Sequence, residues 1–81
     1  MVRVKLWGSL RDFANGEDIV EIEAQNFKQL LDSLSKKYPA LQTEIERGVS
    51  MALDGVIYRE AWFTPISAES EVVLLPYMEG G

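Results

Sequence analysis

Residues 71–76 have the sequence Glu-Val-Val-Leu-Leu-Pro, and this short stretch decides the fold. Its four apolar residues, 72–75, follow one another without a polar interruption. Such a run predicts a strand that is buried on both faces and therefore lies at the centre of a sheet. Pro76 has no N–H to donate to a ladder of hydrogen bonds, so we expect this central strand to end there.

Four further strands are expected upstream of this stretch. Residues 2–6 and residues 19–24 alternate between apolar and charged side chains, which is the pattern of a strand with one buried face. Residues 49–53 alternate again. The pair Asp54-Gly55 then predicts a two-residue hairpin turn, after which residues 56–58 form the returning strand.

One helix is expected between the second and third strands. Asn26 is a suitable N-cap, and Gln29 is placed to complete a capping box. Pro39 stops the helix. The apolar residues after the cap recur at helical spacing and form one broad stripe: Phe27, Leu30, Leu31, Leu34 and Tyr38.

Three connecting segments have weaker patterns. Residues 10–14 have helical spacing and precede an Asn15-Gly16 turn, so a short helical turn is expected there. Residues 41–48 are ambiguous, because Leu41 and Ile45 are four residues apart and allow a helical turn without requiring one. Residues 59–70 are expected to form a loop whose apolar members pack down onto the domain: Ala61, Trp62, Phe63 and Ile66.

The order of elements is therefore strand, strand, helix, strand, strand, strand. A helix and a sheet that each have one apolar surface bury those surfaces against each other. The prediction is an α+β fold of the β-grasp, ubiquitin-like type: a mixed sheet of about five strands, with one main helix packed on one face and the last strand parallel to the first. We expect the domain to span residues 1–76 and residues 77–81 to form a flexible Gly-Gly tail.

The composition argues against several kinds of function. The 81 residues include no Cys and no His, which removes thiolate and imidazole chemistry and the usual zinc ligands; we expect no metal and no bound cofactor. The net charge of −5 disfavours nucleic acid, and no apolar run approaches the roughly 20 residues of a membrane span. A chain this small is expected to be a partner or carrier rather than a self-sufficient enzyme. Nothing in it requires an oxidising compartment, which fits the cytoplasm.

The most informative candidate site is the end of the sequence, Gly80-Gly81. Two residues without Cβ make the thinnest backbone available, and a carboxylate at the end of such a thread can enter a narrow channel in another protein. A frayed terminus without a role is the alternative. The residues just before the pair, Tyr77, Met78 and Glu79, are candidate partner contacts.

The aromatic residues Trp7, Trp62 and Phe63 are open to two interpretations. The favoured one is that they complete a small core. Trp7, however, falls on the polar phase of the first strand, so that Lys5 and Trp7 together would expose an aromatic patch of the kind that binds partners. The paired carboxylates Glu21 and Glu23 are interpreted as a solvated strand face.

Several stretches together resemble the MoaD/ThiS family of ubiquitin-like sulfur-carrier proteins, and most closely the branch of the molybdopterin synthase small subunit. They are residues 2–6, the LRDFANG stretch at 10–16, the helix opening at 26–30, and residues 52–55. The most specific part is the last strand with its proline, running to the terminal Gly-Gly.

The resemblance implies a mechanism that uses partner proteins. An adenylating enzyme related to the ubiquitin-activating enzymes would use ATP to activate the carboxylate of Gly81, which would then become a thiocarboxylate. Gly80 would keep the tail thin. The large molybdopterin synthase subunit, or another sulfur-acceptor enzyme, would receive the tail. A carrier for thiamine or another metabolite, a ubiquitin-like modifier, and an interaction module without sulfur transfer stay open.

Overall fold

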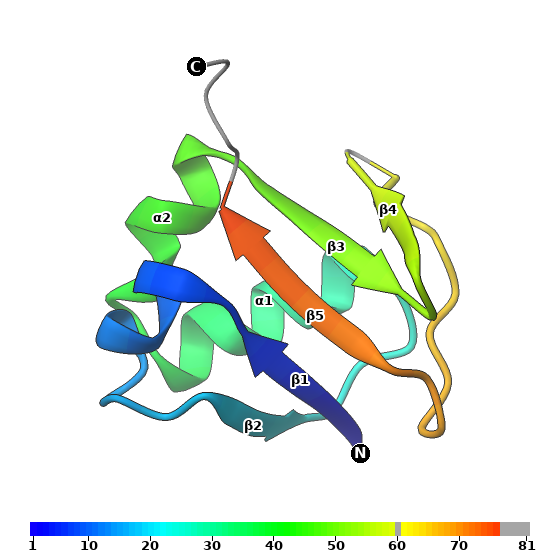
Figure 1. Cartoon of the computed structure of the whole chain (residues 1–81), viewed down its shortest axis with the longest axis horizontal. Helices are drawn as coiled ribbons and strands as arrows, with labels where there is room; N and C mark the ends of the chain where they lie inside the picture. Colours follow the sequence, from blue (N-terminus) through cyan, green and yellow to red (C-terminus); the bar gives the residue numbers. More distant parts are fainter. Residues whose placement is uncertain (60, 77–81) are drawn as a thin grey trace.

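The computed structural model describes residues 1–59 and 61–76, and all structural statements below concern these residues. Figure 1 shows the helices and strands of the domain. In chain order the elements are β1 (Val2–Leu6), the 3-10 helix η1 (Gly8–Phe13), β2 (Ile19–Ile22), α1 (Phe27–Lys37), α2 (Leu41–Arg47), β3 (Val49–Leu53), β4 (Val56–Tyr58) and β5 (Val72–Pro76).

The described strands form one mixed five-stranded sheet in the order β2-β1-β5-β3-β4 (Figure 1). Strand β5 lies at its centre, parallel to β1 and antiparallel to β3. The hairpins β1–β2 and β3–β4 flank it on the two sides. This arrangement is the β-grasp fold, so the predicted fold and the central position of the last strand are both confirmed.

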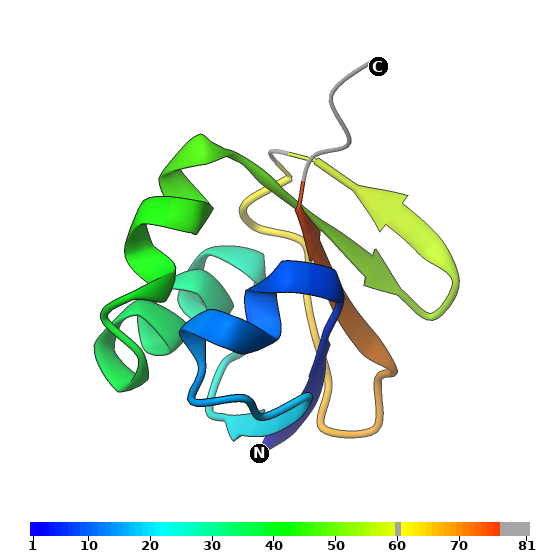
Figure 2. The same ribbon diagram turned by 60° about the vertical axis from the view of Figure 1, so that its left-hand side comes forward.

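The prediction that β5 is buried on both faces is wrong, however. Val72 and Leu74 point into the core and are almost fully buried, whereas Val73 and Leu75 on the other side are only partly covered. The reason is that η1, α1 and α2 all lie on one side of the sheet, as Figure 2 shows from the side. The apolar run therefore marks a central strand whose second face is not covered by a layer of this domain.

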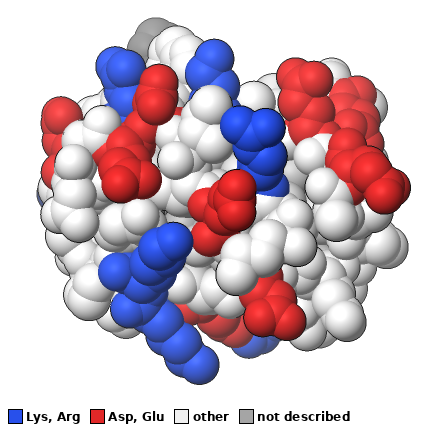
Figure 3. All heavy atoms as spheres, turned by 90° about the horizontal axis from the view of Figure 1, so that it is seen from below, with Lys and Arg blue, Asp and Glu red and all other residues white. Residues whose placement is uncertain are grey.

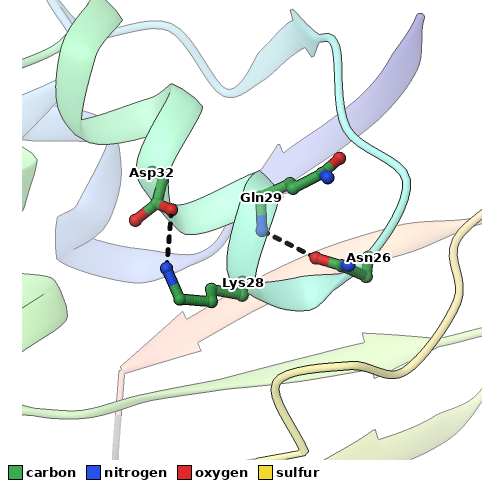
Figure 4. A network of polar contacts seen from close by, with 4 residues as sticks. All are labelled: Asn26, Lys28, Gln29 and Asp32. Carbon is green, nitrogen blue, oxygen red and sulfur yellow. Dashed lines mark hydrogen bonds and ion pairs between the residues drawn. The ribbon is translucent and has the colours of Figure 1, made fainter.

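Helix α1 begins as its sequence predicts. The Asn26 side chain accepts a hydrogen bond of 2.8 Å from the backbone N–H of Gln29, which caps the first turn (Figure 4). The Gln29 side chain accepts from the N–H of Gln25 rather than from that of the cap residue, so the capping box is shifted by one residue. On the solvent side Lys28 and Asp32 form an exposed ion pair at 3.1 Å (Figure 4).

The ambiguous segment 41–48 contains the second helix, α2. Its Leu41 is fully buried, and so is Leu10 from η1, against which α2 packs. Gly48 ends the helix with φ of 118°, a conformation that favours glycine, and leads directly into β3. The two short helices thus extend the layer that α1 begins and close the core beside it.

The loop before β5 packs differently from the prediction. Ile66 is buried, but Trp62 is 41% exposed and Phe63 is 77% exposed, so the interpretation of these aromatics as core residues is wrong. Backbone hydrogen bonds hold the loop to the start of α1, from Phe27 N–H to Thr64 O and from Lys28 N–H to Trp62 O. Trp62 still lies against Phe27, with 5.5 Å between ring centroids, whereas Phe63 extends away from the core.

Candidate docking face

The uncovered side of the sheet carries a continuous row of outward-facing residues, and we call this side the open face. The strand register places one residue of each strand in the row: Ile19, Lys5, Val73, Ala52 and Ile57. Four of the five are apolar, and Ile19 and Ile57 are 44% and 59% exposed. An apolar row of this length on an uncovered sheet is typical of a protein–protein contact surface.

A second row lies one step closer to the end of β5. Leu75 is opposite Ser50, and the side chain of Arg59 donates a hydrogen bond of 3.3 Å to the Ser50 hydroxyl. Trp7 stands next to Leu75, because its backbone N–H donates to Leu74 O at 3.0 Å and it continues the extended conformation of β1.

Of the predicted site residues, only Trp7 lies within the described part of the chain. It is 45% exposed at the open face, so the interpretation of Trp7 as a core residue is wrong, and its role as a partner contact stays a prediction. The other predicted site residues, Tyr77, Met78, Glu79, Gly80 and Gly81, lie outside the described residues. They follow directly after Pro76, whose place in the sheet is opposite Val49.

Two shallow hollows indent the open face, one on each side of Lys5. The first, of about 440 Å³, lies toward the start of β5 and is lined by Arg3, Ile19, Glu69 and Val73 among others. The second, of about 430 Å³, lies toward the tail end of the face between Lys5, Trp7, Arg11 and Asp18. Both are open to solvent and suit side chains of a partner better than an enclosed small molecule.

The described residues contain no acidic group of three or more side chains that could hold a metal ion. Glu21 and Glu23 are both exposed, and Glu21 lies beside Arg3 in the sheet register. Neither has an ion-pair partner within the described part of the chain, in keeping with a solvated surface. None of the helices described is long and apolar enough to cross a membrane.

The open face was only partly visible in the sequence. Its signal is apolar side chains on the outward phase of the strands, and Lys5 and Trp7 were the members that this phase singled out. Ile19, Ile57 and Val73 needed the pairing of the strands, because alternation within one strand does not tell which residues of other strands stand beside it.

The model of the ThiS family matches residues 4–81 of the chain. The solution structure of small archaeal modifier protein 1 from Methanosarcina acetivorans is 28% identical, with a TM-score of 0.83 over 99% of this chain and 95% of that chain. No curated protein matches the sequence.

Two further solved structures share the fold at lower identity. The putative molybdopterin converting factor, subunit 1, from Pyrococcus furiosus is 23% identical, with a TM-score of 0.78 over 95% of this chain and 97% of that chain. CysO from Mycobacterium tuberculosis, described as an antigen, is 17% identical, with a TM-score of 0.78 over 96% of this chain and 100% of that chain.

Proposed function

Because the chain belongs to the ThiS family of ubiquitin-like sulfur carriers, we propose that it carries sulfur as a thiocarboxylate on Gly81. The pathway we propose is molybdopterin synthesis, with this chain as the small subunit of molybdopterin synthase. The observation that carries the proposal is the arrangement of the domain: the β-grasp sheet reaches Pro76 beside an apolar open face, and the sequence continues for five residues to Gly80-Gly81.

The chemistry would take place in two steps on the terminal carboxylate. A carboxylate oxygen of Gly81 attacks the α-phosphorus of ATP, pyrophosphate leaves, and an acyl-adenylate forms. A sulfide-level sulfur nucleophile then attacks the carbonyl carbon, AMP leaves with the former carboxylate oxygen, and the thiocarboxylate remains. Adenylation is needed because a free carboxylate is a poor electrophile and has no good leaving group.

The catalytic groups for these steps are proposed to come from partner proteins. The sequence has no His and no Cys, and the hollows of the open face are shallow. An adenylating enzyme would bind ATP and activate the tail, and a large subunit would receive the loaded tail in a cleft. We propose that this takes place in the cytoplasm, without nucleic acid or membrane.

The open face is proposed to be the surface that both partners hold. Trp7 and Leu75 stand one position before Pro76, so a protein that grips this part of the sheet is directly beside the start of the tail. Tyr77, Met78 and Glu79 would extend the contact into the partner's channel. Gly80 would fit where the channel is too narrow for a side chain.

One specific observation favours a second candidate, a protein modifier. The 28% identical solved structure is named as a small archaeal modifier protein. The same acyl-adenylate would serve this function if a lysine amine of a target protein attacked the carbonyl, released AMP and formed an isopeptide bond. Sulfur carriage for thiamine or another metabolite uses the same loaded tail with a different acceptor.

Mass spectrometry of the intact protein tests the proposal. The chain is incubated with the adenylating enzyme of its own organism, ATP and sulfide, and the expected product has one terminal oxygen replaced by sulfur. Omitting ATP is the matched control. An unchanged mass after full incubation would refute sulfur carriage, and so would a natural protein whose mass shows that Gly81 is not its last residue.

The acceptor is identified in a second experiment. The loaded chain is mixed with the large molybdopterin synthase subunit and its pterin substrate, and return of the mass to that of the carboxylate is expected. Transfer only to a thiazole-forming enzyme of thiamine synthesis would move the chain to that pathway. Conjugates of the chain on cellular proteins, with no transfer to either enzyme, would favour the modifier.

A further inference from the structure

The open face has one charged residue inside its apolar row, Lys5, and the position of this charge sets a requirement on the partner. Its neighbours in the row are Ile19 on β2 and Val73 on β5. A partner that covers the apolar residues of this row must therefore also cover the Lys5 ammonium group. Within the described residues Lys5 forms no ion pair, so this domain supplies no carboxylate for it.

Burying an ammonium group under an apolar surface is strongly unfavourable unless a counter-charge is supplied. The charges around Lys5 differ between the two ends of the face. Toward the start of β5, the carboxylates of Asp54, Glu69 and Glu71 gather around the turns, and Glu71 N–H donates to the Asp54 side chain at 2.8 Å. Arg3 also lines the hollow at this end, so acidic and basic side chains occur there together. Figure 3, a view of this end of the molecule, shows acidic side chains grouped at its right-hand side.

Toward the tail, cations predominate. The hollow beside Trp7 is lined by Lys5 and Arg11 and by one carboxylate, Asp18. Arg11 is exposed, and among the described residues its side chain donates only to Gly8 O, at 3.3 Å. Among the described residues, the part of the open face nearest the tail is thus apolar and cationic, although the whole chain has a net charge of −5.

We propose that the surface of the adenylating enzyme that holds the tail end of the open face is apolar at its centre and presents acidic side chains to Lys5 and Arg11. This inference rests on the proposed function and specifies the chemistry of its partner. The net charge of −5 taken alone would favour a basic partner surface, but the contact depends on the charges of one face and not on the net charge of the chain.

A pair of charge reversals tests the proposal. Lys5→Glu and Lys36→Glu change the net charge by the same amount, but Lys36 lies exposed on α1, on the far side of the sheet. Loading of Gly81 by the adenylating enzyme is measured as kcat/KM with the carrier as the varied substrate. We expect Lys5→Glu to lower kcat/KM by about tenfold or more and Lys36→Glu to leave it within about twofold of the wild type.

The Lys5→Met variant distinguishes a partner surface that supplies a counter-charge to Lys5 from one that only tolerates the lysine. Met retains an apolar stem and removes the ammonium, so it would leave an acidic partner group unpaired, and kcat/KM should fall. The alternative is that the Lys5 ammonium group stays in solvent at the rim of the contact. In that case the Lys5→Met variant should load as well as or better than the wild type, and the proposal is wrong.

The failure of this proposal is distinguishable from the failure of the proposed function. If the wild type is loaded but Lys5→Glu and Lys36→Glu behave alike, or if Lys5→Glu loads faster, the acidic partner surface is refuted and sulfur carriage stands. If the wild type itself is never loaded, the proposed function fails and this inference fails with it. Circular dichroism of all variants checks that they fold, and Lys5→Met remains decisive if Lys5→Glu does not.

Discussion

Asp54 connects two parts of the sheet through its own backbone and side chain. It adopts φ of 49° in the turn between β3 and β4, and Gly55 follows with φ of 87°. Two left-handed residues in succession form the type of turn that matches the twist of a hairpin. The side chain of Asp54 accepts from Glu71 N–H at 2.8 Å, and its N–H donates to Glu71 O at 2.9 Å. One turn residue therefore also fixes the entry into β5.

Asp54→Ala is expected to destabilise the fold by about 1–2 kcal/mol, because alanine loses the acceptor for Glu71 N–H and is strained at a positive φ. Asp54→Asn is the matched variant, since asparagine keeps an oxygen acceptor and tolerates the left-handed region. It should cost clearly less. Urea unfolding of the three proteins measures the difference, and equal losses for Ala and Asn would contradict this role of the side chain.

Single residues were predictable where a local rule decides them. Asn26 caps α1 because its side chain reaches an N–H three residues ahead, a contact that depends on local sequence alone. Phe63 was not predictable in this way. Its exposure of 77% results from how the loop is anchored to the start of α1, and that anchoring joins segments more than 30 residues apart.

At the scale of elements, α1 has its apolar stripe against the sheet as its periodicity predicts. Leu34 is fully buried in this stripe. Leu34→Ala should lower the free energy of unfolding by roughly 2–5 kcal/mol, because it removes buried methyl groups and leaves a cavity. Chemical denaturation measures the change.

The neighbouring Ser35→Ala is the control for this prediction, since Ser35 is only partly buried and lies off the stripe. It should change stability by no more than about 0.5 kcal/mol. A Leu34→Ala protein as stable as the Ser35→Ala protein would mean that this part of α1 does not support the core.

Helix α2 shows why some elements could not be predicted. It has seven residues, its N-cap Ala40 makes no side-chain cap bond, and its one fully buried residue is Leu41. A helix this short is not stable by itself and depends on packing against η1 and β3. Strand β2 likewise ends at Ile22, earlier than the alternation to residue 24 suggests, because the chain must turn there toward α1.

At the scale of the whole molecule, the last described strand, β5, reaches Pro76, and the proposed reactive group lies five residues farther on in the sequence. Deleting Gly81, or adding one residue after it, should therefore abolish loading by the adenylating enzyme and leave Tm unchanged. Thermal unfolding and intact-mass analysis of the same samples test the two halves of this prediction. A marked loss of Tm on deletion would make the tail part of the fold.

The two parts of the candidate site differ in how far sequence can predict them. The Gly-Gly pair is a local pattern and is apparent without a structure. The open face depends on which strands are neighbours. Ile19 and Ile57 are 38 residues apart in sequence, yet they stand in one row because β5 lies between the two hairpins and joins them into one sheet. Long-range pairing of this kind is set by the assembled sheet and not by any one segment.

The central place of β5 also determines when this protein can fold during its synthesis. A ribosome makes β5 after the other four strands, and until it emerges the β1–β2 and β3–β4 hairpins have no strand to join them. A nascent chain stalled before Val72 would expose two unpaired strand edges, which invite aggregation and proteolysis. The domain therefore cannot complete its sheet until β5 has been made.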